Sequence, residues 1–283
     1  EAAAACSTMR LFRTAQKKEG LRFGENHAFI FADFLAQERD ISLELRFSRT
    51  KAMEIYKNGV RQKRQSDAQG LLKTVLFCPE DLALIKSGAA ERRAFLDHAI
   101  CQLRPRYGEA LAQYHKLLDH KTRILRDWEK NPSLLEVLED FNEAMARAGA
   151  LLIHYRAHFV GKLAPRAAQI QRDFSGDREE LTLSYQTVGT VRNPLGPTVS
   201  IYEDLRAHQD SHRRAELEAR SCLSGPHKDD LAAWIDGQPA RQFASQGQTR
   251  TAALSLKLAE REIYKNASGE YPVLLLDDVL SEL

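Results

Sequence analysis

The segment from Phe243 to Leu283 constrains the fold of this chain most, because it combines a helix start with a strand end. Val273 to Leu276 is a continuous apolar run, the pattern of a strand buried on both faces of a parallel sheet, and Asp277 and Asp278 follow it directly. Ligands bind at the carboxyl ends of such strands. Paired carboxylates there suit a hydrated Mg²⁺ ion and an attacking water, since this hard cation prefers oxygen ligands.

The other half of the segment is Ser245-Gln246-Gly247-Gln248, which stands before a helix that we expect from about 249 to 265. The free N–H groups and positive end of a helix favour phosphate, Ser245 adds a hydroxyl donor, and Gly247 lets the backbone approach closely. Each half alone has a structural alternative. Apolar runs that end in two Asp are common, and Ser-x-Gly-Gln often serves only as a helix cap.

In this order, the two halves resemble the signature motif, the Walker B strand and the D-loop of an ABC-type ATPase head. Two further blocks narrow the resemblance, Pro79 to Asp97 and Gly225-Pro226-His227-Lys228-Asp229-Asp230-Leu231. With them, the chain resembles the RecF family, bacterial DNA repair ATPases related to the SMC proteins, over essentially its whole length. The resemblance implies an α/β fold, an ABC-type ATPase head of mixed sheet and helices with an inserted helical lobe.

One departure from the family is the absence of a P-loop, Gly-x-x-x-x-Gly-Lys-Ser/Thr, whose backbone N–H groups and Lys wrap the phosphates. The chain opens at Glu1 in an Ala run that looks like the tail of the helix after that loop, and it stops inside the D-loop. We therefore expect a fragment clipped at both ends. The resemblance implies weak ATP hydrolysis by the intact protein, and we expect no measurable ATP affinity in these 283 residues.

The composition allows one large domain or two ordinary ones, with 283 residues and 43% hydrophobic content. We divide the chain into the rest of a first ATPase lobe (1–79), a helical lobe (80–175) and a returning ATPase segment (176–283). No run approaches the roughly 20 apolar residues of a membrane span, and no leader is visible. Four scattered cysteines predict reduced thiols in a cytoplasmic protein: Cys6, Cys78, Cys101 and Cys222.

The net charge of +2 requires any DNA site to be a local basic patch. One cluster contains Arg10, Arg13, Lys17 and Lys18, and a denser one contains Arg49, Lys51, Lys57, Arg61, Lys63 and Arg64. Scattered Lys and Arg on a hairpin are as often plain solvated surface, and that alternative stays open. Our candidates for DNA contact are Arg13, Lys57, Arg61, Lys63 and Arg64.

The first lobe is predicted to hold antiparallel strands between 28 and 64, because Phe29–Phe34 and Ile41–Phe47 alternate and Asn58-Gly59 is a strong hairpin signal. A buried strand over 75–78 then ends at Pro79. By resemblance, the loop that follows senses the γ-phosphate, and Glu80 and Asp81 occupy it.

The next part is predicted to be helical. Apolar residues recur every three or four positions from Tyr107 to Trp128 and again from Leu134 to Phe159, which predicts a short antiparallel coiled-coil hairpin broken at Asn131-Pro132. Lys121 is the one polar residue in this seam, and Pro165 is expected to kink or end the second helix. The pairs His154/His158 and His208/His212 have metal-compatible spacing, but we favour surface or packing roles for them.

The returning segment is predicted to contain a strand over 181–185, a helix from about 200 to 222, and a hairpin closed by Asp236-Gly237 that joins 233–235 to 240–243. Between them, the turn Gly225-Pro226-His227-Lys228 has two open interpretations, a structural turn or, by resemblance, a place near the bound ATP. The family usually has Arg where Lys228 stands, which leaves its phosphate contact in doubt.

The resemblance implies a site shared by two copies. Ser245, Gln246, Gly247 and Gln248 of one copy would cap the γ-phosphate of ATP held by the other, with His227 and Ser281 nearby. Asp277 would hold Mg²⁺ through water, and Asp278 would orient or deprotonate the attacking water. Because related ATPases usually have the longer Glu there, slow turnover is expected.

The implied function is an ATP-dependent homodimeric clamp on single-stranded or gapped double-stranded DNA, acting in recombinational repair and the SOS response with other recombination mediator proteins. Three alternatives remain: another SMC-like ATPase, a transporter ATPase subunit, and a DNA-binding or scaffolding module without ATP chemistry.

Overall fold

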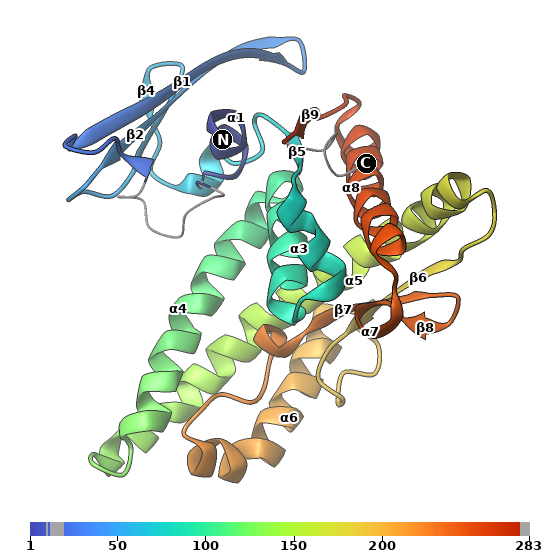
Figure 1. Ribbon diagram of the computed structural model, residues 1–283. Coiled ribbons are helices and arrows are strands. Elements are labelled where there is room, and N and C mark those ends of the chain that lie inside the picture. Colours follow the sequence, from blue (N-terminus) through green and yellow to red (C-terminus); the bar gives the residue numbers. More distant parts are fainter. Residues whose placement is uncertain (10, 12–19, 278–283) are drawn as a thin grey trace.

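The computed structural model of the protein describes residues 1–9, 11 and 20–277 (Figure 1). Three predicted site residues, Arg13, Asp278 and Ser281, lie outside the described residues.

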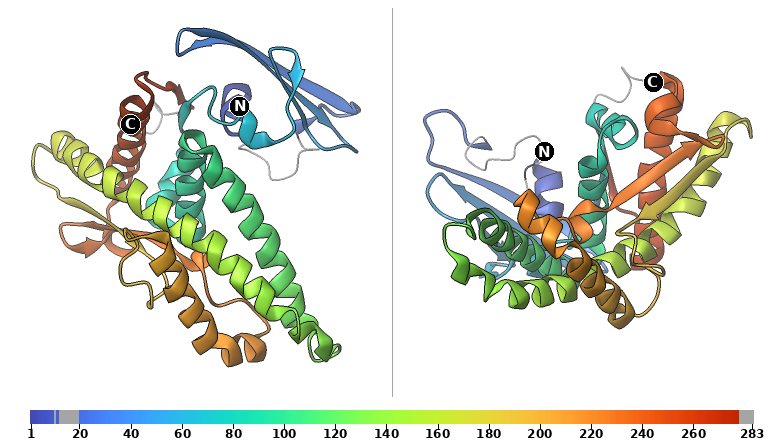
Figure 2. Two further views of the ribbon diagram at one scale, coloured as in Figure 1. Left: turned by 180° about the vertical axis from the view of Figure 1, so that it is seen from behind. Right: turned by 90° about the horizontal axis from the view of Figure 1, so that it is seen from below.

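A four-stranded antiparallel sheet forms one end of the molecule, in the order β1 (His27–Ala36), β2 (Arg39–Ser48), β3 (Glu54–Lys57) and β4 (Val60–Arg61) (Figures 1 and 2). The predicted strands and the Asn58-Gly59 turn are confirmed, and both turn residues have positive φ. The alternating apolar side chains of β2 are buried, with Leu43 and Leu45 packed in one cluster with Cys6 of α1 (Ala2–Thr8). This small core is separate from the larger one below.

Strand β5 (Thr74–Phe77) pairs in parallel with β9 (Val273–Leu276), which brings distant parts of the chain together. Both predicted strands are confirmed, but the predicted burial of β9 on both faces is wrong. Val273 is 48% exposed and Leu276 is 61% exposed, whereas Val75 of β5 is buried. The reason is that β9 has β5 as its single strand neighbour among the described residues, so the apolar run lies at a sheet edge.

The helical part begins with the short turns η3 (Pro79–Leu82) and α2 (Ala83–Lys86) and continues through α3 (Ala89–Leu103), α4 (Pro105–Asp127), η4 (Pro132–Leu135) and α5 (Leu138–Ser175). Helices α4 and α5 run antiparallel side by side (Figures 1 and 2). Pro165 does not end α5, which continues ten residues further to Ser175. Packing of α5 against α6 and α8 offsets the roughly 3 kcal/mol that an interior Pro costs a helix.

The helix predicted from about 200 to 222 is confirmed as α6 (Thr198–Ala219), but the sequence did not predict that it packs on α5 beside the two-helix hairpin. Lys121, the polar residue of the seam, is fully buried, and its Nζ lies 2.6 Å from the Glu216 carboxylate of α6. The polar seam position therefore marks the docking of α6 onto α4.

A second antiparallel sheet consists of β6 (Leu181–Gln186), β7 (Asp230–Ile235) and β8 (Gln238–Pro239). The 3-10 turn η5 (Pro226–Lys228) comes directly before β7. The Asp236-Gly237 turn is confirmed, with positive φ at both residues. Its predicted second strand is wrong over 240–243, which form the short helix α7 (Ala240–Phe243). Pro239 has no N–H for a longer ladder, so the strand stops there. Helix α8 (Gln246–Ser268) follows.

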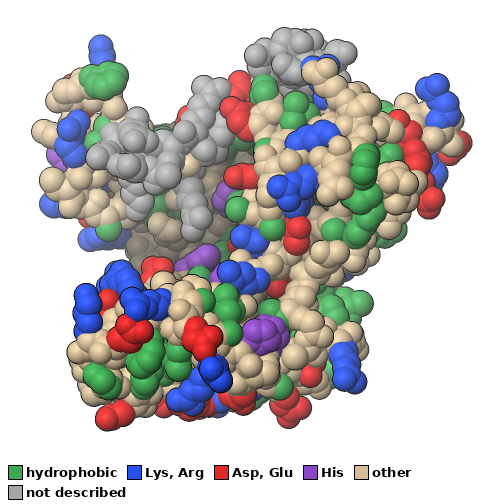
Figure 3. Space-filling model, turned by 60° about the horizontal axis from the view of Figure 1, so that its bottom comes forward, with side chains coloured by type: hydrophobic (Ala, Val, Ile, Leu, Met, Phe, Trp, Pro, Cys, Tyr) green, Lys and Arg blue, Asp and Glu red, His purple; other side chains and the backbone are tan. Residues whose placement is uncertain are grey.

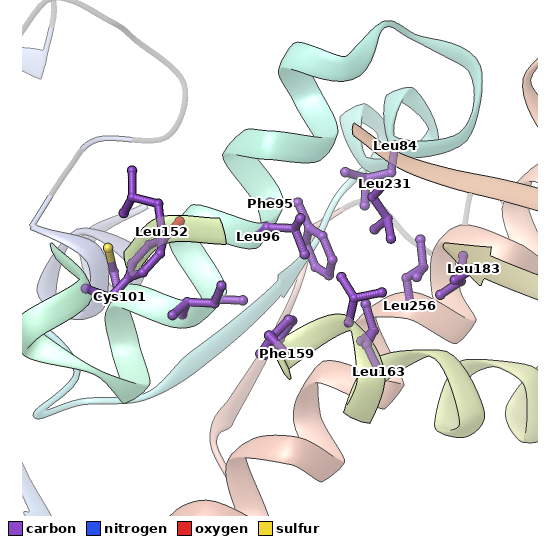
Figure 4. Packing of buried hydrophobic residues seen from close by; sticks show 14 of the residues in the cluster. Leu84, Phe95, Leu96, Cys101, Leu152, Phe159, Leu163, Leu183, Leu231 and Leu256 are labelled. Atoms are coloured by element: carbon purple, nitrogen blue, oxygen red, sulfur yellow. The ribbon is translucent and has the colours of Figure 1, made fainter. Parts of the chain in front are cut away.

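The main core lies between α3, α5, α8 and the second sheet, where Leu96, Leu163 and Leu256 meet (Figure 4). All four cysteines are buried free thiols, as predicted, and burial raises the pKa of Cys6 and Cys222 to about 11. No helix in the described ranges combines the length and apolar character that crossing a bilayer requires. The three-part division of the chain stays a prediction.

Candidate nucleotide-binding site

The loop before α8 is built as an exposed helix cap. Ser245 is the N-cap, and its Oγ accepts a hydrogen bond from Gln248 N at 3.2 Å, while Gln248 Oε1 accepts one from Ser245 N at 2.9 Å. This reciprocal pair fixes the start of the helix. Because Oγ serves only as an acceptor here, the Ser245 hydroxyl proton remains available to a ligand.

The surface of this cap is open. Ser245, Gln246 and Gly247 are exposed, and a Cβ placed on Gly247 would come no closer than 4.0 Å to a neighbouring side chain. The loop is held from behind, where Lys86 Nζ donates to Ala244 O at 2.5 Å. A phosphate can therefore approach the first turn of α8, where Gln248 N is bonded to Ser245 Oγ and the N–H groups of Gln246 and Gly247 have no acceptor within the helix. The structure thus contains both the helix cap and a backbone that is accessible to an anion.

The strand end is described as far as Asp277. Its N–H donates to Phe77 O at 2.9 Å, the last rung between β5 and β9, which places Asp277 at the carboxyl end of the parallel pair as predicted. A carboxylate at this position is a suitable oxygen ligand for Mg²⁺, directly or through water. The other two site residues predicted in this segment, Asp278 and Ser281, lie outside the described residues.

The cap and the strand end are separated along the chain by the whole of α8. Helix α8 has 23 residues and is about 34 Å long, and β9, with four residues, spans at most about 13 Å. Ser245 lies before the first turn of α8, and the loop 269–272 that leads into β9 lies after its last turn. The cap and the segment that leads to Asp277 therefore start from opposite ends of this helix.

The loop after β5 is tied to α8. Asp81 Oδ2 accepts a hydrogen bond from Cys78 N at 2.9 Å, and the buried Lys257 of α8 places its Nζ 3.5 Å from Asp81. Lys257 also lies 3.6 Å from Glu260 and over the ring of Phe95. Asp81 therefore has a structural role, whereas Glu80 is exposed. A change in the conformation of this loop would therefore alter the contacts of α8, the helix that Ser245 caps.

The turn at Gly225 is anchored from inside. Gly225 has φ of 129°, and a Cβ there would lie 2.3 Å from the Tyr114 hydroxyl, so only glycine fits. The Nδ1 atom of His227 lies 2.7 Å from the same hydroxyl, and Nε2 lies 3.1 Å from Cys222 O. Burial lowers the pKa of His227 to about 4, which keeps the ring neutral. These contacts favour the structural interpretation of the turn, and a nucleotide role for His227 stays a prediction.

A buried arginine network holds the same turn, and the sequence did not reveal it. Arg156 of α5 donates to Pro226 O at 2.7 Å and lies 2.8 Å from Asp97 and 3.1 Å from Asp229. Arg92 of α3 forms two hydrogen bonds with Asp230, at 2.6 and 2.9 Å. The sequence signal for this network was the pair of adjacent acids Asp229 and Asp230 after the Gly225 turn. If these carboxylates are buried, they need cationic partners elsewhere in the chain.

Several solved and curated proteins are similar to this chain. The RecF protein of Desulfitobacterium hafniense is 36% identical over 278 residues, which cover 98% of this chain and 74% of that protein. The RecF protein of Desulforamulus reducens is 37% identical, over 96% of this chain and 72% of that protein. The RecF protein of Agathobacter rectalis is 36% identical, over 100% of this chain and 75% of that protein. A structure described as the recombination mediator protein RecF-ATP in the RecFOR pathway has a TM-score of 0.93 and 32% identity, and covers all of this chain and 75% of that one.

This chain belongs to the RecF family. The identity of the curated relative extends over 98% of this chain and the likeness of the solved structure over all of it, not over a single motif. A second solved structure, described as RecF-ATPrS in the same pathway, gives the same TM-score and identity. No protein-family model matches the chain.

The basic residues proposed for DNA contact separate into two groups in this RecF-family chain. Arg61 is paired with Glu54 at 2.8 Å and Arg64 with Glu109 at 2.7 Å, whereas Lys57 and Lys63 have no ion pair among the described residues. Basic and acidic side chains are intermixed on the face shown in Figure 3. Partner carboxylates weaken the local positive field, so the DNA role of these residues stays a prediction.

The predicted histidine pairs form ring contacts within α5 and α6. The rings of His208 and His212 stack with centroids 3.9 Å apart, and His208 Nδ1 lies 2.7 Å from Ser224 Oγ. In the described part of the chain, no group of three or more His, Cys, Asp or Glu side chains is arranged to hold a metal ion.

Proposed function

We propose that this RecF-family chain is the main part of an ATP-dependent, homodimeric DNA clamp for the repair of gapped DNA. The family membership supports a role in DNA replication and repair, and ATP-bound RecF structures with the same fold support ATP as the ligand. The observation that supports the dimer is the placement of the exposed Ser245 cap before α8 and of Asp277 after it, since one copy then presents the two halves of the site from opposite ends of this 23-residue helix.

The residues divide the work between two copies. Ser245, Gly247 and the first-turn N–H groups of one copy bind the γ-phosphate, because a helix amino end with open backbone stabilises an anion. Gln246 and Gln248 flank it, and the Gln248 side chain holds the cap in shape. ATP thereby adds the contacts that join the copies.

The strand end of the other copy supplies the acids. Asp277 binds Mg²⁺ through its hydration shell, and Mg²⁺ neutralises phosphate charge when it is bound. Asp278 orients the attacking water and accepts its proton. Asp has one methylene fewer than Glu, so its carboxylate reaches less far, which explains slow hydrolysis. A slow step suits a clamp that closes on DNA in the cytoplasm, acts with other recombination mediators in gap repair and the SOS response, and opens after hydrolysis.

The test is ATP-dependent dimerisation. The chain, completed with the flanking segments of the Desulfitobacterium relative, is studied by sedimentation velocity with and without ATP and Mg²⁺. We expect monomer without ATP and dimer with it, and we expect Ser245→Arg to stay monomeric because the guanidinium occupies the phosphate position. Ser200→Arg, an exposed serine in the first turn of α6, is the matched control. Equal dimerisation of Ser245→Arg and the parent would show that the site is not shared.

A transporter ATPase subunit is the second candidate from the sequence, and the RecF relatives argue against it. Stimulation of ATP hydrolysis in the completed protein by gapped DNA separates the two functions, because a transporter subunit has no reason to respond to DNA.

A further inference from the structure

A second cavity, distinct from the nucleotide site, lies where α3, α5 and α8 meet, and we name it the α3–α5–α8 pocket. Its volume is about 530 Å³, within the range of ligand-binding pockets. It is lined by Ile100, Leu103, Arg104, His154, Tyr155, His158, Phe159, Lys162, Arg166, Ile263, Asn266 and Ala267. The α8 residues come from its last two turns, whereas Ser245 caps its first, so an occupant of this pocket leaves the cap free.

The rim of the pocket is positively charged. Arg104, Lys162 and Arg166 form no ion pair with any residue that the structure describes, and none of the described residues that line the pocket is acidic. Other arginines at the surface have a carboxylate partner, such as Arg147, which is paired with Glu143 on the same helix, whereas these three cations have none in the described part. Three unpaired cations around one concavity leave it with a positive potential that favours an anionic ligand.

Two histidines and two cations stand in one row on α5. His154, His158, Lys162 and Arg166 are spaced four residues apart, so they lie on one side of the helix, about 6 Å from one to the next along the axis. Burial lowers the pKa of His158, and the nearby His154 and Lys162 lower it further, as a positive environment requires. Lys162 and Arg166 in this row can therefore each meet a carboxylate, one helical turn apart.

The floor of the pocket is apolar. Ile100 and Ile263 are buried and Leu103 is half-buried, and all three line the pocket. A ligand that fills this cavity must carry an apolar group as well as negative charge. Aliphatic or aromatic side chains flanked by Asp and Glu meet both requirements.

We propose that the α3–α5–α8 pocket binds an acidic segment of a protein partner, with an apolar side chain of that segment on the floor and its carboxylates on the rim. Nucleic acid fits less well. Bases bind by stacking on exposed aromatic rings, but Phe159 is 6% exposed and Tyr155 packs edge-on against Tyr107. The phosphates of a duplex would reach the rim and leave the floor unfilled.

The test uses the 283-residue chain and fluorescein-labelled peptides in an anisotropy titration at low salt. The probe is Asp-Glu-Asp-Leu-Phe-Asp-Glu, compared with one version in which Ser replaces Leu and Phe and another in which Asn and Gln replace the acids. We expect the parent probe to bind at least tenfold more tightly than either version. The Ser version loses the apolar contacts with the floor, and the Asn/Gln version loses the charge contacts with the rim. We also expect its affinity to fall as salt is raised, because salt screens the rim.

The variant Lys162→Glu/Arg166→Glu should weaken binding of the probe at least tenfold. Lys116→Glu/Arg123→Glu, which reverses two exposed and unpaired cations on α4, makes the same change in net charge and should leave binding within twofold. Circular dichroism at each step verifies that both variants are folded. Equal weakening by the two variants, equal binding of the three peptides, absence of binding, or preferential binding of an oligo-dT probe at Lys162 and Arg166 would each overturn the proposal.

Discussion

Lys121 and Glu216 form one of the two most deeply buried ion pairs among the described residues, and a double-mutant cycle on this pair tests how the helical part is held together. The two side chains are 0% and 3% exposed, and the Lys121 Nζ lies 2.6 Å from Glu216 Oε2. The other carboxylate oxygen, Oε1, accepts hydrogen bonds from Leu223 N at 2.8 Å and Ser224 N at 3.2 Å. Glu216 therefore connects α4 with α6 and with the chain that leads into the Gly225 turn.

The expected loss in the free energy of unfolding depends on which buried charge each variant leaves without its partner. In Glu216→Gln, the Lys121 ammonium stays buried without its counter-charge, and we expect a loss of about 4 to 5 kcal/mol in the free energy of unfolding. In Lys121→Met, the remaining carboxylate keeps two N–H donors, so the loss should be nearer about 3 kcal/mol. The double variant carries neither charge. It should lose about 2 kcal/mol less than the sum of the single variants.

The assay is urea unfolding at pH 7, followed by far-ultraviolet circular dichroism, with the free energies taken from the midpoints. The pair Arg214–Glu218 is the control, because its side chains are 92% and 66% exposed at a distance of 2.8 Å. Its cycle should show a coupling of at most about 0.5 kcal/mol. If the Lys121 and Glu216 losses add without coupling, the pair does not hold the helices together and the argument from burial fails.

Two further predictions concern His227 and Asp278. Because the His227 pKa is about 4 in the folded chain and 6.5 in its ordinary state, the stability from the neutral ring is fully present above pH 6.5 and is lost as the pH falls toward 4. The loss in the free energy of unfolding is about 2 kcal/mol at pH 5, and urea unfolding midpoints of the parent should show it. The variant His227→Gln should lack this part of the pH dependence. Identical pH profiles for the two proteins would contradict the account of a buried neutral ring. For Asp278→Asn in the completed protein, we expect ATP hydrolysis to fall about 100-fold or more while ATP-dependent dimerisation persists, as measured by phosphate release and sedimentation. Unchanged hydrolysis would exclude Asp278 as the proton acceptor.

Features with a local cause could be predicted from the sequence. The turns at Asn58-Gly59 and Asp236-Gly237 need positive φ, which Asn, Asp and Gly adopt readily, and the Ser245 cap satisfies N–H groups within its own first turn. These signals lie within a few residues of the structure that they produce.

Features that depend on distant partners could not be predicted. The burial of a strand depends on its neighbours, so the apolar run of β9 gave no sign that it forms an exposed edge in the described chain. Likewise, the partner of Lys121 lies on a helix that the two-helix pattern does not contain, and Arg156 gathers carboxylates from α3 and from the segment after the Gly225 turn. The candidate nucleotide residues came from motifs, and the α3–α5–α8 pocket required the positions of three helices.

The parallel pairing of β5 and β9 also has a consequence for how this protein is made. Thr74 and Val273 are about 200 residues apart, and a ribosome adding 5–20 residues per second needs roughly 10 to 40 s to produce the intervening chain. During that time Val75 and Phe77 lack β9, which is their strand neighbour in the described part of the chain, although both are buried in the finished molecule. The newly made amino-terminal part therefore carries an uncovered strand edge on the ribosome, where a holding chaperone would protect it from pairing with another nascent chain.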